Sequence, residues 1–185
     1  QLTLDHGTVK YWEYHTDKRP TLVMIHGFRG THHGLAKIAE NLADFHLLVP
    51  DLPGFGQSDA LTDEHSVENY VEFVAQFIQK LELKPPVVAG PSFGSIVASH
   101  FASTHPDMLS KLVLINPIAA PALQGPRGVM TRLAIAYYWL GRKLPARAAK
   151  SWLGAPPIVR IMSVAMAKTK DKDTLRYIHD QHRQH

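Results

Sequence analysis

The sequence predicts an α/β protein, in which a mostly parallel sheet flanked by helices is followed by a helical region. Through residue 117, short apolar runs typical of buried strands alternate with amphipathic stretches typical of helices. After residue 117 no strand-like run remains, and five Pro and Gly residues between 117 and 128 interrupt the alternation. The chain has 185 residues, 45% apolar and 19% charged, which suits a globular domain and excludes disordered and fibrous classes.

The first region contains the elements of the predicted sheet. Its strands are expected at Val9–His15, Thr21–His26, Phe45–Pro50, Val87–Gly90 and Lys111–Asn116, with a hairpin turn at 5–7 before the first of them. Its helices are expected at His32–Leu42, Ser66–Leu81 and Phe93–His105. The second of these helices has the clearest 3.6-residue periodicity, and Ser66 is its expected N-cap.

The second region differs from the first in charge as well as in pattern. Residues 1–107 carry 7 Lys and Arg against 13 Asp and Glu, whereas residues 108–185 carry 13 against 3. No acidic residue occurs from Met108 to Lys170. Helices are expected at Val129–Leu140, Pro145–Leu153, Ile158–Lys168 and Asp173–His182. We therefore predict two domains, residues 1–117 and residues 118–185.

Several classes of protein are excluded or disfavoured by composition. There is no cysteine, which excludes disulfides, thiol nucleophiles, iron–sulfur clusters and cysteine-ligated zinc. No apolar run approaches the ~18 residues of a membrane helix, and no signal-peptide pattern is present, so we expect a cytoplasmic protein. No nucleic-acid recognition motif accompanies the basic residues, so no nucleic-acid partner is expected. The glycine pattern of dinucleotide-binding proteins is also missing.

The pentapeptide Gly90-Pro91-Ser92-Phe93-Gly94 follows a predicted strand and begins a predicted helix. A tight strand–turn–helix connection lifts the serine hydroxyl above the sheet, and it needs small flanking residues because neighbouring backbones come close. The N-terminus of the helix stabilises negative charge that develops beside it. This context indicates that Ser92 is a nucleophile.

A second loop, His26-Gly27-Phe28-Arg29-Gly30, follows the strand predicted at Thr21–His26. One backbone N–H of this loop and the N–H of the residue after Ser92 are expected to face the same space. Two such donors form an oxyanion hole for acyl transfer, in which each donor contributes on the order of 10²–10³ in rate.

These two loops, with DLPGFGQSD at 51–59 and LVLINP at 112–117, resemble the α/β-hydrolase superfamily, and specifically its branch with a helical cap after the sixth strand. The resemblance covers residues 1–117 closely and residues 118–185 loosely. It implies that Ser92 is the nucleophile, that the backbone N–H groups of Phe28 and Phe93 form the oxyanion hole, and that residues from about 118 form the cap. It further implies loop and elbow glycines at Gly27, Gly90 and Gly94, and a structural role for residues 51–59. One departure is Pro91, where relatives often have His, Asn or Gln.

The acid and the histidine of the catalytic triad have no expected counterpart in the chain. In this family they follow later strands, whereas the 93 residues after Ser92 predict one strand and then helices. We therefore expect residues 1–185 to be the N-terminal part of a hydrolase and to be inactive alone. The histidines present are expected to be structural or solvated, with no metal site: His26, His100, His105, His179, His182 and His185. Asn116 stands where some relatives place the acid, but an amide cannot serve as one.

The same reasoning makes Lys111–Asn116 an exposed edge strand. Such an edge favours aggregation or pairing, so we expect a complementary C-terminal fragment or a dimer partner.

The predicted cap has two interpretations. It is either a lid with an apolar underside, whose basic rim favours an anionic substrate or weak contact with an anionic membrane surface, or a helical subdomain with a solvated basic face, which is the simpler interpretation. Tyr137 and Tyr138 resemble the lid tyrosines of epoxide hydrolases, but those enzymes use an aspartate where this chain has Ser92.

The function favoured by the sequence is a carboxylesterase-like serine hydrolase that cleaves an ester or similarly activated carbonyl of a small acyl substrate. No metal or organic cofactor is expected. A carbon–carbon bond hydrolase or an acyltransferase would use the same nucleophile. An alternative from another class is a ligand-binding or scaffold relative without turnover, against which the intact GPSFG and HGFRG segments weigh.

Overall fold

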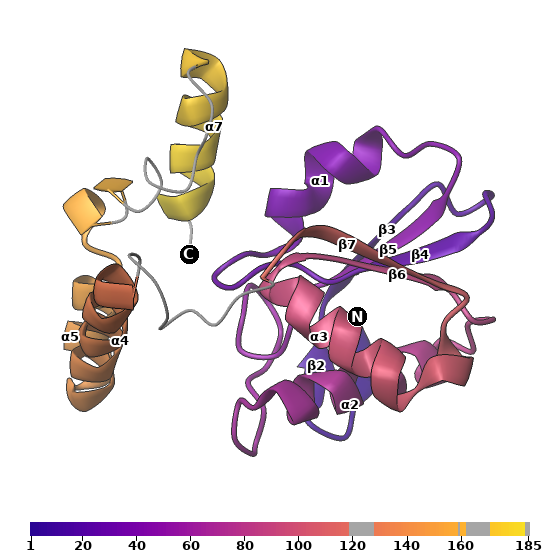
Figure 1. Cartoon of the computed structure of the whole chain (residues 1–185), viewed down its shortest axis with the longest axis horizontal. Helices are drawn as coiled ribbons and strands as arrows, with labels where there is room; N and C mark the ends of the chain where they lie inside the picture. Colours follow the sequence, from indigo (N-terminus) through magenta and orange to yellow (C-terminus); the bar gives the residue numbers. More distant parts are fainter. Residues whose placement is uncertain (119–127, 159, 162–170, 184–185) are drawn as a thin grey trace. The chain divides into compact units, whose positions relative to one another are not determined.

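The computed structural model describes residues 1–118, 128–158, 160–161 and 171–183. The chain divides into two compact units, Gln1–Ile118 and Ala119–His185. This division lies beside the boundary that the change in composition suggests. The first unit holds a two-stranded hairpin, a five-stranded sheet and the helices that cover it (Figure 1).

The five-stranded sheet is mostly parallel, as the sequence predicts. Its strands are β3 (Tyr11–Tyr14), β4 (Thr21–Met24), β5 (His46–Pro50), β6 (Val87–Ser92) and β7 (Lys111–Pro117). The spatial order is β3-β5-β4-β6-β7. Only β3 runs antiparallel to its neighbour, β5, and the other three pairings are parallel. The carboxyl ends of β4, β5 and β6 therefore lie at one edge of the sheet.

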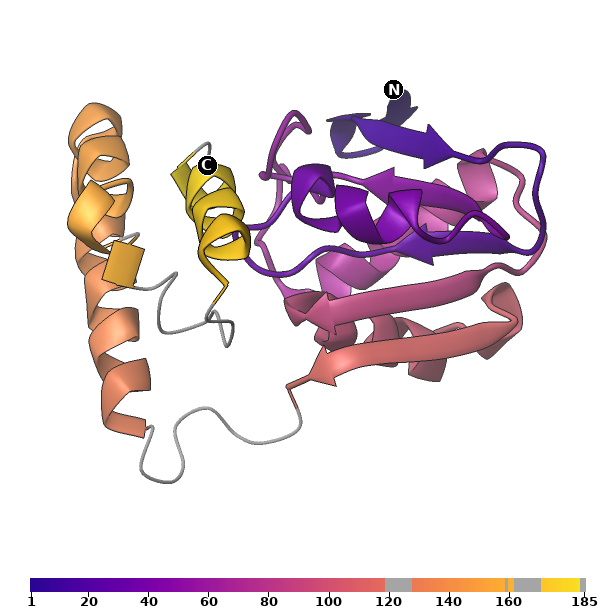
Figure 2. The same ribbon diagram turned by 90° about the horizontal axis from the view of Figure 1, so that it is seen from above.

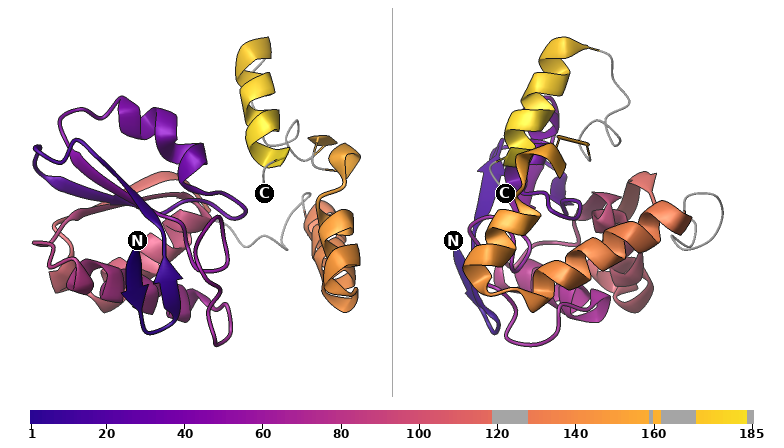
Figure 3. Two further views of the ribbon diagram at one scale, coloured as in Figure 1. Left: turned by 180° about the vertical axis from the view of Figure 1, so that it is seen from behind. Right: turned by 90° about the vertical axis from the view of Figure 1, so that its left-hand side faces the viewer.

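Three helices cover the two faces of the sheet: α1 (His32–Glu40), α2 (Val67–Lys80) and α3 (Phe93–Thr104). The side chains of β4 alternate between the faces, as in any strand. Leu22 and Met24 share a core with residues of α1, whereas Val23 and Ile25 share the other core with residues of α2 and α3. Figures 2 and 3 show α1 on one side of the sheet and α3 on the other.

The N-terminal segment forms a hairpin and then enters the sheet. Strands β1 (Leu2–Leu4) and β2 (Gly7–Val9) pair antiparallel across the expected turn. The single strand predicted at Val9–His15 is instead divided at Lys10. The reason is local: the N–H of Lys10 donates to Ser58 Oγ at 3.0 Å, and its carbonyl accepts from Asp51 N at 2.9 Å. Both backbone polar groups of Lys10 therefore bond to the loop after β5, and the strand is interrupted at this residue.

The strand β7 lies at the edge of the sheet, as predicted. Among the described residues it pairs with β6 alone. Its side chains are poorly covered, since Val113 is 38% and Leu114 is 41% exposed. A short 3-10 helix, Pro106–Met108, leads into it from α3.

The described part of the second unit is helical, with α4 (Gly128–Lys143), α5 (Ala146–Leu153) and α7 (Lys172–Arg183). Tyr137 on α4 stacks on Trp152 of α5, with ring centroids 5.5 Å apart, and its hydroxyl donates to the Trp152 carbonyl at 2.6 Å. The helix expected at Ile158–Lys168 lies largely outside the described residues. Within the described segments, no helix is long and apolar enough to span a membrane.

Candidate active site

Ser92 occupies the turn between β6 and α3 in a conformation that few side chains adopt. Its φ is +52° and its ψ is −117°, and its side chain makes no capping hydrogen bond to the helix that follows. A non-glycine residue at positive φ costs on the order of 1–3 kcal/mol, which the surrounding structure must offset. The hydroxyl of Ser92 is therefore held in a strained turn and is not used to terminate the helix.

The two flanking glycines are required by close backbone approaches. A Cβ on Gly90 would lie 2.2 Å from the carbonyl oxygen of Gly94. A Cβ on Gly94 would lie 2.0 Å from the carbonyl oxygen of Ile25, which belongs to the adjacent strand segment. Ser95 reinforces the turn, because its hydroxyl donates to the Ser92 carbonyl at 2.5 Å. Packing alone thus explains the G-x-S-x-G spacing, with the serine at its centre.

The loop after β4 lies against this turn. A Cβ on Gly27 would be 3.5 Å from Ser92 Cβ and 3.9 Å from Ser92 Oγ. The loop is a tight turn, with Arg29 at φ +56° and Gly30 N donating to the Gly27 carbonyl at 2.9 Å. Phe93 begins α3, so its N–H is one of the first-turn donors that have no acceptor within the helix. The structure brings together the two segments expected to form an oxyanion hole.

Aromatic rings extend from these two segments. The ring of Phe28 is 54% exposed and makes edge-to-face contacts with Phe55 at 5.9 Å and with Phe93 at 6.2 Å. Phe93 in turn contacts Tyr70 of α2 at 5.5 Å. Tyr70 is buried, which raises the pKa of its hydroxyl to about 12, and the hydroxyl donates to the Pro53 carbonyl at 3.2 Å. An apolar wall therefore lies beside Ser92 and is anchored to the loop after β5.

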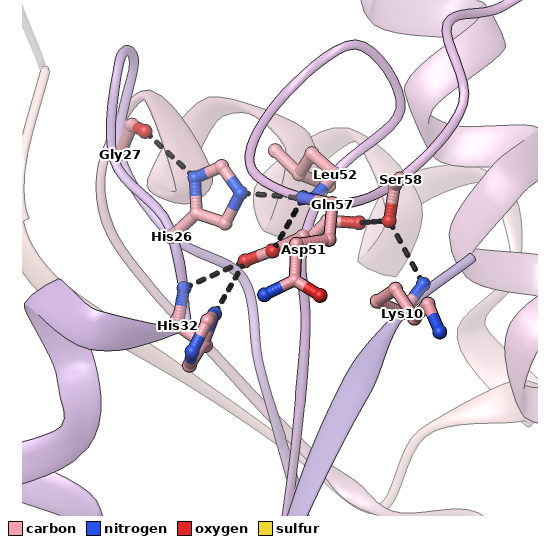
Figure 4. A network of polar contacts seen from close by, with 8 residues as sticks. All are labelled: Lys10, His26, Gly27, His32, Asp51, Leu52, Gln57 and Ser58. Atoms are coloured by element: carbon pink, nitrogen blue, oxygen red, sulfur yellow. Dashed lines mark hydrogen bonds and ion pairs between the residues drawn. The ribbon is translucent and has the colours of Figure 1, made fainter. Parts of the chain in front are cut away.

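The loop after β5 is organised by Asp51, which is fully buried (Figure 4). Its Oδ1 accepts from His32 N at 2.8 Å and from His32 Nδ1 at 3.0 Å, and its Oδ2 accepts from Gln57 N at 3.0 Å. Position 56 requires glycine, because a Cβ there would lie 2.0 Å from Asp51 Oδ2. Ser58 Oγ donates to the Asp51 carbonyl at 2.7 Å. We call Asp51, His32, Gln57 and Ser58 the Asp51 network.

His32 is a neutral donor in this network. It is buried and its ring stacks on that of Trp12. Burial lowers the pKa of His32, and the hydrogen bond to Asp51 opposes this effect only in part. A neutral His32 with its proton on Nδ1 is the tautomer that the contact with Asp51 requires. The carboxyl group of Asp51 is consequently occupied by backbone and ring N–H groups and has a structural role.

His26, expected to be structural, has both ring nitrogens engaged. Leu52 N donates to His26 Nε2 at 2.9 Å, so Nε2 is unprotonated and Nδ1 carries the proton. His26 Nδ1 then donates to the carbonyl of Gly27 at 2.8 Å. His26 therefore ties the loop after β4 to the loop after β5 (Figure 4), and neither nitrogen is available to act as a base.

Of the remaining residues considered from the sequence, Asn116 lies beside Ser92 on the neighbouring strand, whereas the two histidines of the described residues that follow Ser92 on α3 or at its end have other surroundings. His100 is exposed on α3, two turns beyond Ser92 and so ~12 Å along the helix axis. His105 follows α3, stacks on Phe101 and lies within hydrogen-bond distance of Thr104. Asn116 is exposed at the end of β7, at φ +47°, in the bulge between Ile115 and Pro117, which pair with Pro91 and Ser92. The side chains of His179 and His182, and all of His185, lie outside the described residues. Within the described residues, no group of three or more His, Asp or Glu has the arrangement of a metal site.

A cavity of about 710 Å³ lies away from Ser92, at the amino ends of the strands. Its lining includes Thr21 at the start of β4, and His46 at the start of β5, whose Nε2 is 2.6 Å from Glu13 Oε1. Ligands of parallel sheets bind at the carboxyl ends of the strands, so we do not assign this cavity to the site.

Sequence reasoning missed the residues that hold the loops in place. It treated residues 51–59 as one structural loop, on the strength of the family resemblance, and did not single out Asp51, His32 or Tyr70. One signal was available: an aspartate directly after a strand of five buried residues must find hydrogen-bond donors. Two of the three donors, His32 N and Gln57 N, are backbone groups, which no side-chain pattern identifies.

Comparisons with known proteins identify the family of the chain. The sequence model of the family described as the alpha/beta hydrolase fold matches residues 20–154. The chain is 32% identical over 117 residues to the uncharacterized hydrolase YugF of Bacillus subtilis. The aligned region covers 62% of this chain and 43% of YugF. It is 38% identical over 98 residues to the pimeloyl-[acyl-carrier protein] methyl ester esterase of Chromobacterium violaceum, covering 52% of this chain and 36% of the esterase.

Solved structures show the same fold. A hydrolase from Pseudomonas aeruginosa superposes with a TM-score of 0.70 at 19% identity, over 97% of this chain and 64% of that chain. Of the two curated relatives named above, YugF and the methyl ester esterase, the chain spans less than half the length.

Proposed function

Because the chain belongs to the α/β-hydrolase family, we propose that it carries the nucleophile and the oxyanion hole of a serine hydrolase that cleaves an ester or similarly activated carbonyl. One observation carries the proposal. Ser92 is held at φ +52° without a capping bond, and Gly27 lies against it with no side chain between the loop backbone and the serine hydroxyl. A strained serine that contributes nothing to the end of a helix is the arrangement expected of a nucleophile.

The proposed reaction is acyl transfer through Ser92. As a base removes the hydroxyl proton, Ser92 Oγ attacks the carbonyl carbon and the carbonyl electron pair moves to oxygen. The N–H groups of Phe28 and Phe93 donate to that oxyanion. Collapse of the intermediate expels an alcohol, which takes the proton from the base, and water then hydrolyses the acyl-serine by the same steps. The chain's contribution is the nucleophile, the two donors and the aromatic wall.

We place the base and its acid partner outside residues 1–185. His26 uses both ring nitrogens for structure, and Asp51 is occupied by three N–H donors. On this proposal residues 1–185 alone do not turn over substrate. The exposed edge of β7 is the expected place for a complementary portion of the protein.

Ester cleavage is the preferred reaction within the family. The relative from Chromobacterium violaceum is named as a methyl ester esterase, which supports this choice. Carbon–carbon bond hydrolysis and acyl transfer to an acceptor other than water remain the alternatives. A panel of short and long acyl esters, tested against a vinylogous diketone, separates them: turnover of the esters alone supports the proposal, and turnover of the diketone alone overturns the choice of ester.

A fluorophosphonate probe followed by intact-mass measurement tests the nucleophile and the origin of the base together. Two samples are compared: the 185-residue chain, and the protein as it is produced in its source cell. We expect one adduct in the source-cell protein, lost in Ser92→Ala and kept in Ser99→Ala, an exposed serine of the same helix. We expect no adduct in the 185-residue chain. Absence of labelling in both samples refutes Ser92 as the nucleophile, and labelling of the short chain at Ser92 refutes an external base.

A further inference from the structure

The helix α4 presents an apolar surface that its neighbour does not cover. Val129, Leu133 and Leu140 are 64%, 59% and 47% exposed. They are spaced four and seven residues apart, so they lie on one face of the helix. We call these three residues the α4 stripe. Several exposed apolar side chains on one face of a helix are typical of an interaction surface.

The contact between α4 and α5 uses a different face of α4. It is made by Tyr137, which stacks on Trp152, and by Gly141, where a Cβ would lie 2.8 Å from Leu153 Cδ2. At 100° per residue, Tyr137 and Gly141 lie about 60° and about 100° around the helix from the centre of the α4 stripe. The packing that holds the two helices together therefore leaves the stripe uncovered.

Basic and aromatic side chains border the stripe. Arg132 and Lys143 lie about 60–80° from its centre, on the side away from α5. Lys143 Nζ is 5.7 Å from the ring centroid of Trp139, which is 52% exposed. The charge is of one sign, because Met108–Lys170 contains ten Lys and Arg and no Asp or Glu. An apolar row with a cationic and tryptophan border resembles the surface of helices that lie in a membrane interface.

We propose that the α4 stripe and its basic border bind an anionic lipid bilayer, with α4 lying in the plane of the headgroups. The 16 residues of α4 make a helix of ~24 Å, which suits an interfacial position and is too short to span the ~30 Å hydrocarbon layer. Charge favours this occupant over a second copy of the chain. A second copy would bring its own Arg132 and Lys143 against the same cations, whereas anionic lipid neutralises them.

Vesicle binding by the 185-residue chain tests the proposal without relying on Ser92 or on turnover. The probes are vesicles of phosphatidylcholine alone and of phosphatidylcholine with a quarter phosphatidylglycerol. We expect co-sedimentation with the anionic vesicles, weakened by salt, and a blue shift of tryptophan emission that is lost in Trp139→Phe. Leu133→Gln should weaken binding at least tenfold. Arg132→Gln with Lys143→Gln should weaken it roughly 30-fold, at about fivefold per charge near the surface.

The matched control removes two cations elsewhere. Lys80 and Lys111 are exposed residues of the first unit, so Lys80→Gln with Lys111→Gln changes the net charge equally and should leave binding within about twofold. Circular dichroism checks that each variant stays helical. Equal binding to both vesicle types overturns the anionic partner. Self-association that Leu133→Gln abolishes, or protection of α4 amides without vesicle binding, assigns the stripe to protein and overturns the proposal, as does an equal loss in the control variant.

Discussion

Two loops at the same edge of the sheet use their polar groups in opposite ways. In the Asp51 network, every oxygen of a fully buried carboxyl group accepts from a backbone or ring N–H. In the turn at Ser92, a hydroxyl sits at positive φ and gives no capping bond to its own helix. In the first loop the polar groups stabilise the fold through hydrogen bonds. In the second loop the serine hydroxyl does not cap its helix, and the backbone there is strained.

This contrast separates a structural aspartate from a candidate nucleophile by their hydrogen bonds. Asp51 and Ser92 both follow buried strands, and both lie in loops rich in glycine. Their residue types and positions would admit a catalytic role for each. The difference is that removing Asp51 should damage the fold, whereas removing the Ser92 hydroxyl should damage only the proposed chemistry. The four predictions that follow test this difference.

The largest effect on stability is expected for Asp51→Ala. The change leaves buried N–H groups of His32 and Gln57 without acceptors, so we expect the free energy of unfolding to fall by about 3–5 kcal/mol. Urea denaturation measures it. Asp44→Ala, an exposed aspartate near the same strand, should change stability by less than about 0.5 kcal/mol. Similar small effects for the two variants would show that the network does not hold the loop.

The next largest effect is expected for Gly94→Ala. The added Cβ would lie 2.0 Å from the carbonyl oxygen of Ile25, which forces a shift between α3 and the end of β4 and costs about 1–3 kcal/mol. Gly34→Ala is the matched control, since a Cβ at Gly34 meets nothing within 4 Å and lies inside helix α1. We expect that control to raise stability by about 0.5–1 kcal/mol. Thermal or urea unfolding measures both stabilities. Equal stabilities of the two variants would mean that close packing does not explain the glycine at position 94.

A smaller effect of opposite sign is expected for Ser92→Gly. Glycine accepts positive φ without strain, so the free energy of unfolding should rise by about 0.5–1 kcal/mol while fluorophosphonate labelling of the source-cell protein disappears. Ser99→Gly provides the comparison, because the same exchange at an exposed helical position should lower stability by about 0.5–1 kcal/mol. A loss of stability in both variants would mean that Ser92 is not strained and would weaken the contrast between the loops.

The sequence predicts the sheet and its helices well because their signals are local. Ser66 is the N-cap of α2, as predicted, and its Oγ accepts from Asn69 N at 3.2 Å. The buried strands and the edge position of β7 follow from continuous apolar runs and their order in the chain. The division at Lys10 could not be predicted, because it depends on hydrogen bonds to Ser58 and Asp51, some 40 residues or more away.

The part of the candidate site that the sequence predicts is the pair of loops whose glycines permit close backbone approach. The segments around Gly27 and Ser92 were expected to meet, and the structure places them in contact. The tautomer of His26 and the saturation of Asp51 depend instead on which backbone N–H groups point at them. Those directions are properties of the folded loops, which explains why the sequence predicts a structural role for His26 but not which of its ring nitrogens carries the proton.

The smallest expected effect is a pH dependence of stability through His32, a buried member of the Asp51 network. Burial lowers the pKa of His32 below its ordinary value of 6.5, while the bond to Asp51 opposes the shift. Below about pH 6.5 the unfolded chain therefore binds a proton that the folded chain does not, and stability falls as the pH drops toward the lowered pKa.

Because the two causes oppose each other, the loss should be smaller than in the variants above. His32→Asn keeps a side-chain donor but cannot titrate, so its stability should fall less than that of the wild type between pH 7.5 and pH 5.5 in paired urea titrations. Lys37→Gln, on the same helix, should keep the wild-type pH dependence. A steeper fall in His32→Asn than in the wild type would mean that Asp51 dominates over burial. The network would then favour the charged imidazolium, and the assignment of a neutral His32 would be wrong.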